Sequence, residues 1–181
     1  MASGIAVHQR NWRRMSLEAD QRSLLSRYLQ GPALLEQAVA DLSDADLDAP
    51  PSDGGWTIRQ IVHHVVDGDD LWMTCIKAAL GNEEDDFTLE WYWQLPQDTW
   101  AERWGYAHRP LDVSLALFGA IRAHIAQLVE RAPDGWSRSM RVRTPQGTER
   151  VSVRAVLEMQ ADHVSHHVER IAAIRAERGD A

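Results

Sequence analysis

The stretch WTIRQIVHHVV, residues 56–66, has the features of the start of a long helix. Thr57 and Gln60 have the spacing of a capping box, in which each side chain satisfies a backbone N–H group at the helix start. Apolar residues then recur at helical spacing, at Ile58, Ile61, Val62, Val65, Trp72 and Ile76. The pattern predicts a helix from about Thr57 to about Leu80, with one face buried.

Three further segments show the same helical periodicity. They run from about Asp20 to Asp41, with Gly31-Pro32 as a candidate bend, from Pro110 to Pro133, and from Ser152 to Arg178. Residues 41–55 are polar and rich in proline, which predicts a loop, and residues 1–19 are expected to form an N-terminal extension. The fold class expected is therefore all-α, with one four-helix bundle domain over residues 20–178.

The connection between the second and third predicted helices is long. Residues 81–110 should form short helical turns at most, and we expect them to cross from one end of the bundle to the other. Their tryptophans could wall a substrate cavity, although packing or dimer contacts are more common roles for such residues. Between the third and fourth helices, the alternation around Pro145-Gln146-Gly147 predicts either a small hairpin or an extended loop.

The composition restricts the class of protein. The formal net charge of −8 disfavours a nucleic-acid partner, which needs a cationic face. No segment approaches the roughly 20 apolar residues that span a bilayer, and the N-terminus lacks the pattern of a secretory signal, so we expect no membrane association and a cytoplasmic location. The single cysteine, Cys75, excludes an intrachain disulfide and a CxxC site, and packing is its expected role. A metal here would need nitrogen and oxygen ligands.

The histidines of HVSHH, residues 163–167, are not equivalent on a helix. His167 falls inside the apolar stripe of the fourth helix, and His163 lies one turn earlier at its edge, whereas His166 points to the polar flank. On the second helix, His64 lies at one margin of the inward face. If these helices are neighbours, His64, His163 and His167 could hold one metal ion with open positions, the pattern of a catalytic site. Zinc would suit it, and nickel, iron or manganese are compatible.

Other interpretations of these residues stay open. Two histidines four residues apart are more often surface or hydrogen-bonded residues than ligands. Asp67 could orient a metal-bound water as a catalytic residue, or be an ordinary polar helix residue. His124 shares a face with Leu117 and Ile121 and is expected to point inward as a core histidine. The HExxH signature is absent, because Val164 follows His163.

GGWTIRQIVHHVVDGDD at residues 54–70 and HVSHHVERI at residues 163–171 together resemble the DinB/YfiT-like superfamily. The likeness covers roughly residues 20–176 and is closest to the YfiT-type branch, which is related to bacillithiol transferases and often labelled metal-dependent hydrolases. It implies a four-helix bundle with a crossover, commonly dimeric, and a divalent metal held by three histidines. The family's ligands match His64, which precedes Val-x-Asp, and the pair His163 and His167. Ser152 to Ala155 depart from the pattern, since they lack the acidic residue of a full capping box.

The resemblance also implies a chemistry. In relatives that resemble this protein, the metal binds a low-molecular-weight thiol for attack on an electrophile, and a dication favours thiolate over thiol. The leading hypothesis is therefore thiol S-transfer, with a small-molecule electrophile and a thiol cosubstrate as partners and a homodimer as the assembly. The alternatives are hydrolysis by a metal-bound hydroxide, with Asp67 orienting the water, and a metal-free stress-response or binding bundle.

Overall fold

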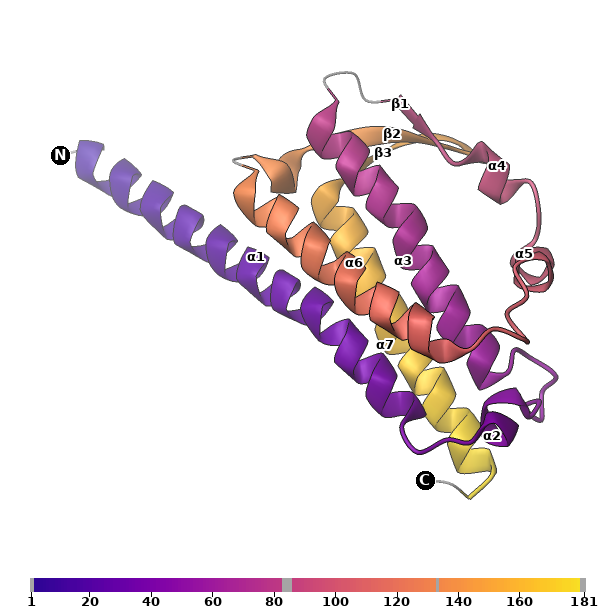
Figure 1. Cartoon of the computed structure of the whole chain (residues 1–181). Helices are drawn as coiled ribbons and strands as arrows, with labels where there is room; N and C mark the ends of the chain where they lie inside the picture. The colour runs from indigo at the N-terminus through magenta and orange to yellow at the C-terminus, as the bar shows by residue number, and fades with distance from the viewer. Residues whose placement is uncertain (1, 83–85, 133, 180–181) are drawn as a thin grey trace.

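The computed structural model describes residues 2–82, 86–132 and 134–179, with the backbone alone for residues 2–17 and 86–87. Four long helices pack into a bundle (Figure 1), and they are α1 (Ala2–Val39), α3 (Ile58–Gly81), α6 (Leu111–Arg131) and α7 (Val153–Glu177). Helix α1 contacts α6 and α7, and α3 contacts the same two helices. The predicted four-helix bundle is confirmed.

The two helices that carry the candidate ligands begin where the sequence predicts. Thr57 caps α3, with its backbone N–H donating to Gln60 Oε1 at 2.9 Å and the N–H of Gln60 donating to Thr57 Oγ1 at 3.3 Å. Ser152 caps α7 by accepting from the N–H of Ala155 at 3.1 Å. These caps satisfy backbone donors that the first helical turn leaves free, and so they fix where each helix starts.

Two expectations for the N-terminal part are wrong. Helix α1 begins at Ala2 rather than near Asp20, because residues 2–19 contain no proline and one glycine to interrupt a helix that gains a backbone hydrogen bond with each added residue. The expected loop at residues 41–55 includes the short helix α2 (Asp44–Asp48), which Ser43 and Asp46 start with a capping box of their own. The spacing of those two residues carried this signal in the sequence.

Pro32 lies inside α1 without ending it. Because proline has no N–H, the carbonyl of Tyr28 four residues earlier lacks its helical donor. Arg122 of α6 supplies the replacement, with Nη1 donating to Tyr28 O at 2.6 Å. A Cβ at Gly31 would collide with this guanidinium nitrogen, so glycine at that position allows the approach. The Gly-Pro pair is thus a docking point for α6.

The Arg122 side chain connects all four long helices at the centre of the bundle. Its Nε and Nη2 donate to the two carboxylate oxygens of Asp69 on α3, both at 2.9 Å, and Nη2 also donates to the carbonyl of Gln160 on α7 at 2.9 Å. The rings of Tyr28 and Phe118 lie 4.3 and 4.5 Å from the guanidinium carbon. Arg122 and Asp69 have fully buried side chains. We call Tyr28, Asp69, Arg122 and the Gln160 carbonyl the arginine cluster.

The connection after α3 crosses from one end of the bundle to the other, as predicted (Figure 1). It contains β1 (Asp86–Thr88), α4 (Glu90–Trp93) and α5 (Gln97–Arg103). Of the two alternatives left open around Pro145-Gln146-Gly147, the hairpin is present, as β2 (Ser139–Thr144) and β3 (Gly147–Ser152), and β1 adds to β2 as a parallel strand in the order β1-β2-β3. A 3₁₀ turn, η1 (Gly135–Ser137), precedes β2. The sequence did not predict β1, because a strand of three residues carries too little periodicity to detect.

Helix α6 is the helix among the described residues whose length and mean hydropathy would allow it to cross a membrane. It packs against α1 and α3 instead, and it carries the buried charge of Arg122 together with the fully buried Phe118 and Ile125. Its apolar composition is that of a core helix.

Candidate metal centre

The three histidines selected from the sequence come together between α3 and α7. His163 Nε2 lies 3.0 Å from His64 Nε2 and 3.1 Å from His167 Nε2. One ligand atom from each residue lies within 4.8 Å of the others. His163 and His167 share a face because they are one turn apart on α7, and the packing of α3 on α7 brings in His64, ninety-nine residues earlier.

All three imidazoles are neutral at pH 7. Burial, together with the neighbouring imidazoles, lowers the pKa of His64, His163 and His167 to about 4 each. Arg122 also contributes to lowering the pKa of His163. A metal ligand must offer an unprotonated nitrogen, so the environment that disfavours the imidazolium keeps these rings ready to bind a cation.

The donor set fits a divalent ion. Tetrahedral bonds of about 2.0–2.1 Å from zinc to imidazole nitrogen place two ligand atoms about 3.3 Å apart, a few tenths of an ångström more than the spacing here. An ion on Nε2 leaves the proton on Nδ1, which then needs an acceptor. Within the part of the chain that the structure describes, the Nδ1 atoms of His163 and His167 are buried without a partner, and so is one acceptor, Oε1 of Gln160, one turn before His163. We call these three imidazoles the histidine cluster.

Aromatic side chains from the crossover side support the histidine cluster. The Trp56 ring packs edge-on to the His64 ring, with centroids 4.8 Å apart. Trp56 Nε1 donates to Asp98 on α5 at 2.7 Å, and the Trp56 ring also contacts Tyr106 edge-on. The crossover therefore helps to hold the His64 imidazole in place.

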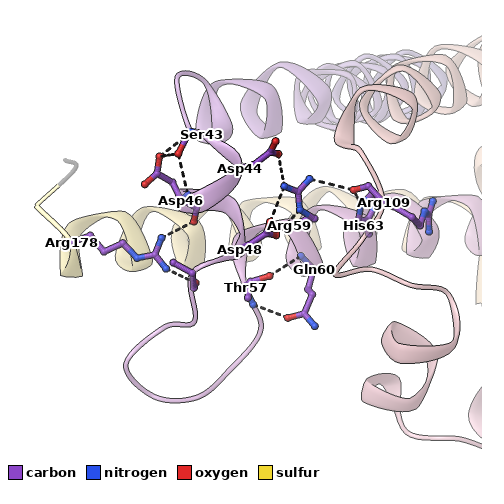
Figure 2. A network of polar contacts seen from close by, with 11 residues as sticks. Ser43, Asp44, Asp46, Asp48, Thr57, Arg59, Gln60, His63, Arg109 and Arg178 are labelled. Carbon is purple, nitrogen blue, oxygen red and sulfur yellow. Dashed lines mark hydrogen bonds and ion pairs between the residues drawn. The ribbon is translucent and has the colours of Figure 1, made fainter.

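The other side of α3 is anchored by polar contacts (Figure 2). Buried His63 contacts Ser114 Oγ through Nδ1 and the carbonyl of Arg109 through Nε2, both at 3.0 Å. Arg59 donates to Asp44 and Asp48 at 2.5 and 2.6 Å, which ties α2 to α3. Both ring nitrogens of His63 are engaged by these neighbours, so His64 is the histidine of the pair that joins the histidine cluster.

Asp67 lies one turn after His64 and is paired. Its carboxylate forms an ion pair with Arg109 at 3.1 Å, and its side chain is 18% exposed. The same carboxylate adds to the effect of burial in raising the pKa of Tyr106. The geometry neither requires nor removes the predicted catalytic role of Asp67, which stays a prediction.

The remaining candidates are His166, His124 and Cys75, and none of them belongs to the histidine cluster. His166 is exposed, as expected for the residue on the polar flank. His124 is also exposed, so its expected inward position is wrong, because the buried face of α6 runs through Phe118, Ile121, Arg122 and Ile125. Cys75 is buried, and burial raises the pKa of its thiol to about 12, in agreement with a packing role.

Sequence reasoning missed the charged residues that support the site. Arg109 and Arg122 each act across elements, on partners 42 and 53 residues away, so no local spacing links them to Asp67 or Asp69. The available signal for Arg122 was its position between the apolar residues Ile121 and Ile125, because a charge on a buried stripe needs a partner.

The chain belongs to the DinB superfamily, whose sequence model matches residues 27–171. A relative from Bacillus licheniformis is 30% identical over 166 residues, which cover 90% of this chain and 91% of the relative. A relative from Geobacillus kaustophilus is 28% identical over 150 residues, covering 82% and 80%. Both carry names that provisionally assign them to metal-dependent hydrolases.

Solved structures show the same fold. YfiT from Bacillus subtilis, described provisionally as a metal-dependent hydrolase with an unusual four-helix bundle topology, has a TM-score of 0.76 at 25% identity, covering 88% of each chain. A mycothiol-dependent maleylpyruvate isomerase has a TM-score of 0.62 at 18% identity, covering 83% of this chain and 60% of that one. The resemblance to the DinB/YfiT-like superfamily is thereby confirmed.

Proposed function

We propose that this protein is a divalent-metal-dependent enzyme that transfers a low-molecular-weight thiol to a small-molecule electrophile. His64, His163 and His167 are the proposed ligands, and the observation that carries the proposal is the convergence of their three neutral imidazoles. Three protein nitrogens leave coordination positions open for a cosubstrate. Imidazole ligands suit zinc and nickel best, and iron and manganese are compatible. The names of the relatives support metal dependence.

The thiol must come from a cosubstrate. Cys75 is buried among the core residues, and a thiol with a pKa of about 12 holds almost no thiolate at pH 7. A divalent ion, when bound, supplies the positive charge that favours the thiolate of the cosubstrate. The three histidines would hold the ion. Because their buried rings are uncharged, they would leave its positive charge available to a bound thiolate.

The state of Asp67 favours a thiol over water as the nucleophile. Water is far less acidic than a thiol, so hydrolysis gains more from a carboxylate that is free to accept a proton. Asp67 is the carboxylate one turn after His64, and it already accepts from Arg109. Thiol transfer depends less on a free carboxylate at Asp67, because a thiol gives up its proton more readily than water does. The fold itself accommodates thiol-dependent chemistry, since the isomerase that shares it is named mycothiol-dependent.

Metal-dependent hydrolysis is the second candidate, and the names of the relatives favour it. In that case Asp67 would release Arg109 and orient water. A metal-free binding bundle is the third candidate. The proposal also includes a homodimer, which rests on family resemblance. It includes a cytoplasmic location as well, with which the single buried cysteine agrees.

Metal analysis of protein purified without a histidine tag tests the proposal first. We expect about one divalent ion per chain after reconstitution, and loss of that ion in His163→Ala. His166→Ala is the matched control, because His166 lies on the same helix but is exposed, and it should keep the ion. Absence of stoichiometric metal in the native chain would overturn both enzymatic candidates.

Reaction of the loaded protein with a model electrophile then separates those two candidates. S-transfer predicts thiol consumption equal to electrophile consumption, with both lost in His163→Ala. Electrophile consumption that continues without any thiol would assign hydrolysis instead.

A further inference from the structure

A cavity of about 430 Å³ lies between α3 and the crossover, and its lining is chemically mixed. It is lined by Asp67, Asp70, Leu71, Trp91, Trp104 and Arg109. Two tryptophans, one leucine and three charged groups thus face one space. Such a combination of apolar walls with a few polar groups is typical of a small-molecule site.

The cavity and the histidine cluster both involve residues of α3. Asp67 is three residues after His64 and Asp70 is six, which at about 1.5 Å per residue places Asp70 about 9 Å further along the helix axis. Contacting rings also connect the two places, since Trp104 contacts Tyr106, Tyr106 contacts Trp56, and Trp56 contacts His64. The offset along the helix axis is within the length of a small molecule.

The charges in the lining do not cancel. Arg109 is neutralised by Asp67, with Nη1 and Oδ2 3.1 Å apart. Asp70 is exposed to the cavity and forms no ion pair with the described residues, so the lining keeps one negative charge. Trp91 is 45% exposed, which leaves part of a large aromatic surface open beside this charge. A carboxylate next to open tryptophan rings favours a cation over an anion or a neutral group.

We propose that this cavity binds a positively charged ammonium group of the small molecule on which the enzyme acts. The inference rests on the proposed function for the identity of that molecule as a substrate. Asp70 supplies the charge, and Trp91 and Trp104 supply aromatic surface beside it.

The first test uses probes without a thiol and protein without metal. n-Hexylamine, 1-hexanol and hexanoate share one chain and differ in charge, and their binding is followed by tryptophan fluorescence and calorimetry. We expect the amine to bind about fivefold more tightly than the other two, the size expected for an exposed ion pair plus a cation–π contact. Asp70→Asn and Trp91→Leu should each remove most of that preference.

Asp20→Asn is the matched control. It removes the same charge from an exposed position on α1, which lies on the opposite side of the bundle from α4 and α5 (Figure 1). It should leave the preference for the amine unchanged, which separates a local contact from the overall negative charge of the protein. Equal binding of the three probes, or an unchanged preference in Asp70→Asn, would overturn the inference. Tighter binding of hexanoate would assign the cavity to Arg109 and overturn it as well.

The second test joins the cavity to the proposed reaction. 6-Amino-1-hexanethiol, 6-mercapto-1-hexanol and 6-mercaptohexanoate are offered to the loaded enzyme with a neutral electrophile. A severalfold lower KM for the aminothiol, lost in Asp70→Asn, would place the ammonium on the thiol cosubstrate. The same preference seen instead with an amine-bearing electrophile and a neutral thiol would place it on the electrophile. Failure of every thiol to react, with amine binding retained, would overturn the proposed function and leave the cavity assignment standing.

Discussion

The bundle contains two buried polar clusters one turn apart along α7, and they differ in how their atoms are paired. In the arginine cluster, the Arg122 guanidinium reaches both oxygens of Asp69 and two backbone carbonyls, and its charge is balanced. In the histidine cluster, three imidazoles face one another, and among the described residues the Nδ1 atoms of His163 and His167 have no partner.

The difference separates a structural role from a functional one. A buried polar group that is left unpaired costs stability, so a fold tolerates it where something else completes it. The arginine cluster is complete within the chain and ties four helices together. The histidine cluster is incomplete within the described residues, and we propose that a bound ion and acceptors for its Nδ1 protons complete it, as expected of a binding site.

The largest effect is expected from Asp69→Asn. It leaves the guanidinium of Arg122 buried without a counter-charge, which should lower the free energy of unfolding by about 3–5 kcal/mol. Urea denaturation measures this, and Asp70→Asn, at the next residue but exposed, should change the free energy by less than about 0.5 kcal/mol. The double variant Asp69→Leu with Arg122→Met should recover only part of the loss, because it removes both charges but leaves the buried carbonyl of Tyr28 without the donor that Arg122 supplies. A small effect of Asp69→Asn would show that the arginine cluster does not tie the bundle.

The next effect concerns the pH dependence of the metal-free protein. The folded pKa of each clustered histidine, about 4, lies below the ordinary value of about 6.5, so between these values the unfolded chain binds more protons. The free energy of unfolding should therefore fall as the pH is lowered from about 7 toward 4, by an amount on the order of 2 kcal/mol after allowance for solvent. Denaturation at several pH values measures it. The variant with all three replaced by Gln should have a shallower dependence, and an equal slope would contradict the assignment.

A third prediction separates metal binding from folding at one residue. Gln160→Leu removes the buried acceptor Oε1 and keeps a similar volume, so metal affinity should fall about 10- to 100-fold if this oxygen accepts the Nδ1 proton of His163. The metal-free protein should be as stable as the native chain or more so, because an unpaired polar atom is lost. Competition with a chromophoric chelator measures affinity, and thermal unfolding measures stability. Parallel losses in both would assign Gln160 to folding alone.

The smallest effect is expected at the start of α3. Thr57→Ala removes the side-chain half of the capping box and should lower stability by about 1 kcal/mol. Thr57→Ser keeps the hydroxyl and should restore most of it. Metal affinity measured on the folded protein should stay within about twofold, because His64 lies two turns further along α3. A large loss of affinity would mean that the cap, as well as the packing of α3 on α7, positions His64.

Much of the fold followed from local signals. The capping residues Thr57 and Ser152 located two helix starts, and Pro145-Gln146-Gly147 located the hairpin, because these preferences act over a few residues. The start of α1 and the exposure of His124 were wrong. The start of α1 depends on how far a helix continues without a stop signal, and the exposure of His124 depends on which face of α6 meets a neighbour. A short window of sequence contains neither fact.

Local sequence was sufficient to locate the four long helices and to pair His163 with His167, because residues one turn apart on a helix share a face. It offered His64 as a third member through family resemblance and helical position. The packing of the helices was needed to show that Arg109 neutralises Asp67, that Arg122 replaces the donor missing at Pro32, and that Asp70 faces a cavity with Trp91. These contacts join residues on separate elements, and their energies arise from burial and charge that exist only once the helices have packed.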